Sequence, residues 1–168
     1  KTIEAKDKYT KGHSARVAKY SVMIGEKFGY DSEKLKRLEY SAMLHDVGKI
    51  GISDAIINKT ERLTDEEYEE IKKHPVIEMP DIQDGARWHH ERYGGEGYPD
   101  GLSGNDISEI ARIIGVADAY DAMTSTRSYR GYLPQDVVRG EIERGSGKQF
   151  DPQFADIMLH IIDEDKEY

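Results

Sequence analysis

The chain of 168 residues contains no cysteine. This absence excludes disulfide bonds and thiolate metal ligands, and it fits the reducing cytoplasm, where we expect the protein to be located. Aromatic residues other than tyrosine are scarce, with three Phe and one Trp against eleven Tyr. No stretch approaches the roughly 20 apolar residues of a membrane span, and no signal peptide is visible, so we expect no membrane contact.

Basic residues are in the minority, with 24 Lys and Arg against 33 Asp and Glu and a formal net charge of −9. A broad basic face of the kind that neutralises DNA or RNA phosphates is therefore not expected. A small anionic substrate is compatible with this charge, because bound cations and a few local Lys or Arg residues can reverse the field inside a pocket. The composition favours a small-molecule ligand over a nucleic-acid polymer.

The sequence predicts one all-α domain covering residues 1–168. Because the chain begins at Lys1, we expect this domain to come from a longer signalling protein with several domains. Apolar residues make up only 37% of the sequence and charged residues 34%, which suits helices with solvated outer faces. Apolar positions recur at spacings of three and four in nearly every segment, which predicts about seven to eight helices. They are expected at residues 10–28, 33–47, 53–57, 64–74, 81–91, 108–125, 134–144 and 152–163.

Local signals mark several boundaries of these helices. Thr64 and Glu67 form a capping-box pattern, and Asp151-Pro152 combines an N-cap with a proline in the first turn. On the helix that Thr64 opens, we expect Tyr68 to face inward. The stretch 92–101 is too rich in glycine for the interior of a helix or strand, so it is predicted to be a loop.

Five of the six histidines fall in an order that indicates a metal site, together with two aspartates. The candidate ligands are His13, His45, Asp46, His74, His89, His90 and Asp118. Imidazole and carboxylate are ligands of borderline-to-hard divalent metals, and this many candidates could hold two metals rather than one. A pair of metals in turn suggests hydrolysis of a phosphate ester. His160 has no motif around it and is expected to be an ordinary histidine.

The motifs that contain these residues resemble the HD-GYP family, a branch of the HD-domain metal-dependent phosphohydrolases. The resemblance covers almost the whole chain and rests on seven motifs in order. They are Tyr9-Thr10-Lys11-Gly12-His13-Ser14, His45-Asp46-Val47-Gly48-Lys49, His74-Pro75, His89-His90-Glu91-Arg92, Gly97-Tyr98-Pro99, Asp118-Ala119-Tyr120-Asp121-Ala122-Met123-Thr124 and Arg127-Ser128-Tyr129-Arg130. It implies an HD-domain helical bundle with a metal site in its centre.

The resemblance also implies an activity, the hydrolysis of cyclic di-GMP to linear pGpG or onward to GMP. It assigns all seven candidate ligands to two divalent metals, expected to be iron or manganese, with Asp46 bridging them. A hydroxide held between the metals would attack phosphorus. Lys49 would contact the scissile phosphate or assist the leaving oxygen, and Arg127 and Arg130 would pair with phosphate oxygens. Tyr98 would stack on guanine or pack beneath the site, and its loop is an expected contact for protein partners; a homodimer is left open.

The sequence departs from the family pattern at two important points. Tyr9 stands where some members carry a Glu that helps to hold a third metal, which favours two metals here. The stretch from His74 to His89 is about ten residues shorter than the family pattern implies, which puts the reach of His74 in doubt. Two alternatives to cyclic di-GMP hydrolysis stay open. One is a module that binds cyclic dinucleotides with little turnover, and the other is hydrolysis of another nucleotide such as cyclic GMP-AMP.

Overall fold

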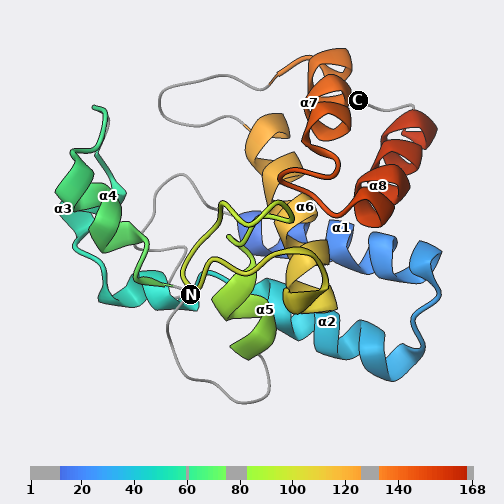
Figure 1. The fold of residues 1–168 in the computed structure, drawn as a ribbon, viewed down its shortest axis with the longest axis horizontal. Coiled ribbons are helices and arrows are strands. Elements are labelled where there is room, and N and C mark those ends of the chain that lie inside the picture. The colour runs from blue at the N-terminus through green and yellow to red at the C-terminus, as the bar shows by residue number, and fades with distance from the viewer. Residues whose placement is uncertain (1–11, 60, 75–82, 126–132, 166–168) are drawn as a thin grey trace.

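The computed structural model describes residues 12–59, 61–74, 83–125 and 133–165, and within these ranges the fold is all-α (Figure 1). Eight α-helices lie in the described ranges: α1 (His13–Phe28), α2 (Ser32–Leu44), α3 (Asp54–Ile57), α4 (Asp65–Ile71), α5 (Gln83–Trp88), α6 (Glu109–Thr124), α7 (Gln135–Gly145) and α8 (Pro152–Glu164). The 3-10 helices η1 (Val47–Gly51) and η3 (Gly104–Asp106) also lie within these ranges. The predicted fold class is therefore confirmed.

The helix boundaries follow the capping residues in the sequence. The Thr64 hydroxyl accepts a hydrogen bond from the Glu67 backbone N–H, and the Glu67 carboxylate accepts one from the Thr64 backbone N–H, which completes the predicted capping box. Asp151 caps α8 through the N–H of Gln153, with Pro152 in the first turn as expected. Helix α2 ends at Leu44, earlier than predicted, because the chain tightens into η1 directly after Asp46.

The hydrophobic core lies where α1, α2, α6, α7 and α8 pack together. Helix α6 contributes an unbroken buried face, and α8 covers it from the other side with Phe154 and Met158. The buried residues of α6 are Ala111, Ile113, Ile114, Val116, Ala117, Tyr120 and Asp121. Helices α3 and α4 lie to one side of this bundle (Figure 1). The core thus fixes α1, α2 and α6 relative to one another. Helices α1 and α6 carry candidate metal ligands, and α2 leads directly into two more, His45 and Asp46.

Within the described ranges, every helix is too short or too polar to span a bilayer.

Candidate metal centre

The seven candidate ligands come from separate elements and converge in the middle of the molecule. His13 is the first residue of α1, and Asp118 lies near the middle of α6. The others stand at or just beyond the ends of helices, with His45 and Asp46 after α2, His74 after α4, and His89 and His90 after α5. Helix ends are suited to this role because their side chains can turn towards a common point without breaking the helical ladder.

The ligand atoms form two groups, and within each group all of them lie within 4.8 Å of one another. The first group contains Asp46, His74, His89 and His90, and the second contains His13, His45 and Asp118. In the second group, Nε2 of His13 is 3.3 Å from Oδ1 of Asp118. Tertiary packing therefore brings every predicted ligand into one of two neighbouring clusters.

Asp46 lies between the two groups, with one carboxylate oxygen towards each. Its Oδ1 is 3.2 Å from Nε2 of His74, whereas its Oδ2 is 3.5 Å from Nε2 of His45 and 3.8 Å from Nε2 of His13. Burial acts to raise the pKa of this carboxyl, but the Lys49 ammonium, 2.6 Å from Oδ2, helps to hold that pKa well below its ordinary value. Asp46 is therefore ionised, and each of its two oxygens would be able to hold a cation.

Three of the histidine rings are oriented by the backbone in the same way. The Nδ1 atoms of His45, His74 and His89 each donate to the carbonyl oxygen three residues earlier, over 2.6, 2.7 and 2.8 Å. Each acceptor is in or at the last turn of a helix, where carbonyl oxygens have no partner from the helix itself. In a neutral ring, a proton held at Nδ1 by this hydrogen bond leaves the Nε2 lone pair to bind a metal.

The free Nε2 atoms show that this donor set fits divalent metals. Nε2 of His45, His74 and His89 is buried and makes no hydrogen bond within the described ranges. Nε2 of His45 and of His74 lies against a carboxylate oxygen of Asp46, and two such acceptors repel each other unless a metal ion or a proton lies between them. Buried polar atoms without a partner are costly, and a bound divalent ion would remove that cost.

The environment also keeps two imidazoles of the first group, His89 and His90, neutral. Burial and the neighbouring His90 lower the pKa of His89 well below its ordinary value. Burial and the nearby His74 lower the pKa of His90 to about 3. A neutral imidazole is the metal-binding form, so no proton has to be displaced from either ring.

His13 differs from the other histidines because a carboxylate orients it. Its Nδ1 donates to Oδ2 of Asp121 over 2.7 Å, and Asp121 in turn accepts from Nε of Arg16 over 2.5 Å. Burial acts to lower the pKa of His13, but the hydrogen bond to Asp121 and the charges of Asp118 and Asp46 raise it. Three carboxylates around one ring stabilise positive charge there, whether as a proton or as a metal ion.

Arg16 was not among the residues singled out from the sequence. It follows His13 by three residues, and side chains at that spacing lie on the same face of a helix, so the signal was present. Asp121 follows Asp118 on α6 by the same spacing. Both pairs place a supporting side chain one turn from a candidate ligand.

The Gly-Tyr-Pro loop forms one wall beside the first group. The ring of Tyr98 stacks on His90, with centroids 4.8 Å apart. Glu91, which is buried, accepts hydrogen bonds from the backbone N–H groups of Asp100, Gly101 and Leu102 over 2.7, 3.0 and 3.1 Å. Because one carboxylate accepts hydrogen bonds from three backbone amides of the loop, it holds the loop in a single conformation.

Two glycines permit close backbone approaches that shape the site. A Cβ at Gly97 would overlap the backbone of Glu91 and Arg92, so the loop closes on itself only with glycine there. A Cβ at Gly48 would overlap the carbonyl of His74. Gly48 thus allows η1 to pass directly against His74, and this contact brings His74 to Asp46.

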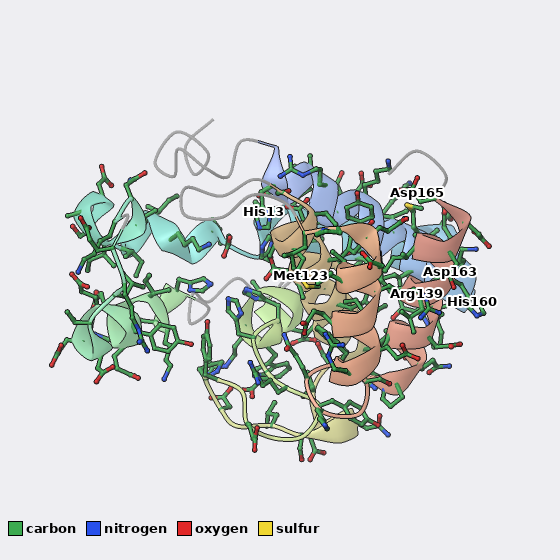
Figure 2. All side chains as sticks on the ribbon, turned by 90° about the horizontal axis from the view of Figure 1, so that it is seen from above. His13, Met123, Arg139, His160, Asp163 and Asp165 are labelled. Carbon is green, nitrogen blue, oxygen red and sulfur yellow. The ribbon has the colours of Figure 1, made fainter. Side chains whose placement is uncertain are left out.

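Three sequence expectations concern residues outside the described ranges. Arg127 and Arg130, the predicted phosphate contacts, follow α6 and lie outside those ranges, as does Tyr9. The short stretch between His74 and His89 includes residues 75–82, which also lie outside. His160 is exposed on α8, and Figure 2 shows it far from His13.

A cavity of about 440 Å³ opens beside the clusters. Its wall contains the candidate ligands His89, His90 and Asp118, with Tyr98 beside them. Tyr68 from α4 and Lys72, which directly follows α4, also line it. This position of Tyr68 differs from the prediction, in which it faced inward. The volume is in the range of small-molecule sites.

The fold and the clusters define a helical domain built around a centre of histidines and aspartates for divalent metals. The family model of the HD domain matches residues 1–154. The chain belongs to the HD domain family, and its resemblance to the HD-GYP branch is confirmed.

Relatives and a solved structure agree with this assignment. The chain is 36% identical over 170 residues to the cyclic di-GMP phosphodiesterase response regulator RpfG of Xanthomonas campestris pv. campestris. The aligned region covers 95% of this chain and 45% of that protein. The chain is 35% identical over 162 residues to the 3'3'-cGAMP-specific phosphodiesterase 3 of Vibrio cholerae, covering 91% of the chain and 35% of that protein. The chain thus spans less than half the length of these curated relatives.

Among solved structures, the fold is similar to Bd1817, a HDG"Y"P protein from Bdellovibrio bacteriovorus. The TM-score is 0.71 at 20% sequence identity, covering 90% of this chain and 51% of that one. At this identity the similarity concerns the fold.

Proposed function

We propose that this domain is a metal-dependent phosphodiesterase that hydrolyses cyclic di-GMP to linear pGpG or onward to GMP. The observation that carries the proposal is the position of Asp46, whose two oxygens face two histidine groups beside an open cavity. Family membership supports it, because relatives with more than 30% identity are named phosphodiesterases of cyclic dinucleotides.

Seven residues would hold two divalent metals, with Asp46 as the shared ligand. They are His13, His45, Asp46, His74, His89, His90 and Asp118. Iron or manganese suits this set of imidazole and carboxylate donors. When bound, two such metals supply charge stabilisation for the phosphate and activation of water at neutral pH.

Other residues around the clusters are proposed to handle the substrate. Lys49 places its ammonium beside Asp46, with a quarter of its side chain exposed, so its charge is available to the scissile phosphate or to the leaving oxygen. Tyr98 presents a ring in the cavity wall, where it would contact the nucleotide. Arg127 and Arg130 are proposed to pair with phosphate oxygens on sequence grounds alone.

The test is turnover of cyclic di-GMP by protein prepared without oxygen and loaded with Mn²⁺ or Fe²⁺. Close to two metals per chain and release of pGpG or GMP, resolved by chromatography, are expected. Asp46→Asn should lose both metal loading and turnover, whereas Asp163→Asn, which alters an exposed pair with Arg139, should keep both. Full turnover by Asp46→Asn would contradict the proposal.

A second candidate substrate is cyclic GMP-AMP. The observation that favours it is the 35% identity to a 3'3'-cGAMP-specific enzyme, close to the 36% shared with a cyclic di-GMP enzyme. Measuring kcat/KM for both dinucleotides on the same metal-loaded sample decides between them. A value at least tenfold higher for cyclic GMP-AMP would replace cyclic di-GMP as the proposed substrate.

A further inference from the structure

Tyr68 is an aromatic side chain that the hydrophobic core does not use. It lies on α4, to one side of the main bundle, and 47% of its surface is exposed. Tyr68 lines the cavity beside the two groups of candidate ligands. What distinguishes Tyr68 from other exposed aromatic residues is its place in the cavity wall, where a bound ligand could contact it.

Lys72 lies between Tyr68 and the Gly-Tyr-Pro loop. Its Nζ is 5.0 Å from the ring centroid of Tyr68 and 5.8 Å from that of Tyr98. Tyr98 in turn stacks on the candidate ligand His90. A series of contacts therefore links the candidate ligand His90 through Tyr98 and Lys72 to Tyr68 along the cavity wall.

This arrangement matches the chemistry of a nucleotide base attached to a reacting phosphate. An aromatic ring offers a stacking platform to the face of a base. A lysine ammonium has three N–H donors and no acceptor, and guanine presents two acceptors, O6 and N7, on one edge. On the same edge, adenine presents the acceptor N7 beside an amino group that is itself a donor. An ammonium placed there would face another donor, so this site would favour guanine over adenine.

We propose that Tyr68 and Lys72 form a subsite for a guanine base of the substrate. The inference rests on the proposed phosphodiesterase function and extends it to the origin of base selectivity. Tyr68 stacks on the base, and Lys72 donates to its O6 and N7 while the phosphate lies towards the clusters. The Lys72 ammonium also contacts Glu69 over 2.6 Å.

The test compares variants on two substrates, cyclic di-GMP and methyl p-nitrophenyl phosphate, a small phosphodiester without a purine. For Tyr68→Ala, the ratio of kcat/KM for cyclic di-GMP to that for the small diester is expected to fall on the order of tenfold, through KM. Tyr68→Phe keeps the stacking face and should keep the ratio within about twofold. Tyr40→Ala is the matched control, because Tyr40 is 64% exposed on α2 and does not line the cavity.

The contribution of Lys72 is tested separately with Lys72→Met. This variant should lose more affinity for cyclic di-GMP than for cyclic di-AMP, measured by calorimetric titration. Equal losses for both ligands would show that Lys72 contacts phosphate, and this would overturn its assignment to guanine. An unchanged substrate ratio in Tyr68→Ala would overturn the stacking assignment.

The same samples separate this inference from the proposed function. If the wild-type protein turns over no substrate, the phosphodiesterase proposal fails, but titration with cyclic di-GMP still tests the subsite. Weaker binding by Tyr68→Ala than by the wild type and Tyr40→Ala would then support it. Equal binding by all three, or none by the wild type, would refute it.

Discussion

His13 donates its Nδ1 proton to Asp121 over 2.7 Å, and this hydrogen bond joins the first residue of α1 to the buried face of α6. It fixes the ring so that Nε2 points to Asp118 and Asp46. Asp121 is itself held by Arg16. Burial acts to raise the pKa of Asp121, but His13 and Arg16 lower it, so the carboxylate stays charged at neutral pH.

Replacing Asp121 with Asn is therefore expected to weaken metal binding about 10- to 100-fold, the usual effect of losing a group that orients a ligand. The amide keeps the size of the side chain but removes the charge that holds the His13 ring and its tautomer. Titration of metal-free protein with Mn²⁺ measures the change. Asp163→Asn is the control, because Asp163 and Arg139 lie far from His13 (Figure 2). Equal Mn²⁺ affinity in both variants would exclude a positioning role for Asp121.

Removal of metal is expected to lower thermal stability. A ligand that binds only the folded state stabilises it by about 2.7 kcal/mol at 100 times its Kd. Thermal unfolding should therefore show a rise in Tm when Mn²⁺ is added to chelator-treated protein. His45→Ala removes a proposed ligand and should abolish most of this rise, whereas His160→Ala, an exposed histidine on α8, should retain it. A rise of the same size in both variants would argue against the proposed site.

Gly97→Ala is expected to destabilise the fold by about 1–3 kcal/mol, the usual cost of overpacking. The added methyl group would overlap the backbone of Glu91 and Arg92, and backbone atoms have little room to move. Urea denaturation gives the change in the free energy of unfolding. Gly51→Ala is the matched control, because a Cβ there would meet no atom within 4 Å. Equal midpoints for the two variants would contradict the close approach at Gly97.

Tyr30 provides a prediction at alkaline pH. Its hydroxyl donates to Glu109, and burial together with this carboxylate raises its pKa above the ordinary value. A group whose pKa is raised on folding contributes stability below its unfolded pKa, near 10 for tyrosine, and that stability is lost as the pH rises further. Tyr30→Phe should cost about 1 kcal/mol at pH 7 to 9, since one hydrogen bond is lost.

The difference in the free energy of unfolding between the wild type and Tyr30→Phe is expected to shrink as the pH rises above about 10. Urea unfolding of both proteins at pH 7, 9 and 10.5 measures it, and the subtraction cancels the other tyrosines. A constant difference across these values would show that Tyr30 titrates normally.

Much of the fold was predictable because the signals are local. Apolar spacing of three and four residues placed most of the helices, and the capping box at Thr64 placed the start of α4 within a residue. The end of α5 was not predicted, since His89 and His90 continue an acceptable helical pattern but lie in the turn after Trp88. Tertiary contacts offset the cost of ending the helix after Trp88, and the spacing of apolar residues in the sequence carries no information about such contacts.

The identity of the candidate ligands was likewise readable from residue type and order, without any structure. Tertiary packing alone decided how they are arranged, with the two oxygens of Asp46 turned to different groups and His74 brought in by a glycine at position 48. It also decided that Tyr68 faces a cavity and not the core. The physical reason is that periodicity and caps act over a few residues, whereas contacts such as the one between His13 and Asp121, 108 positions apart, depend on how whole helices pack.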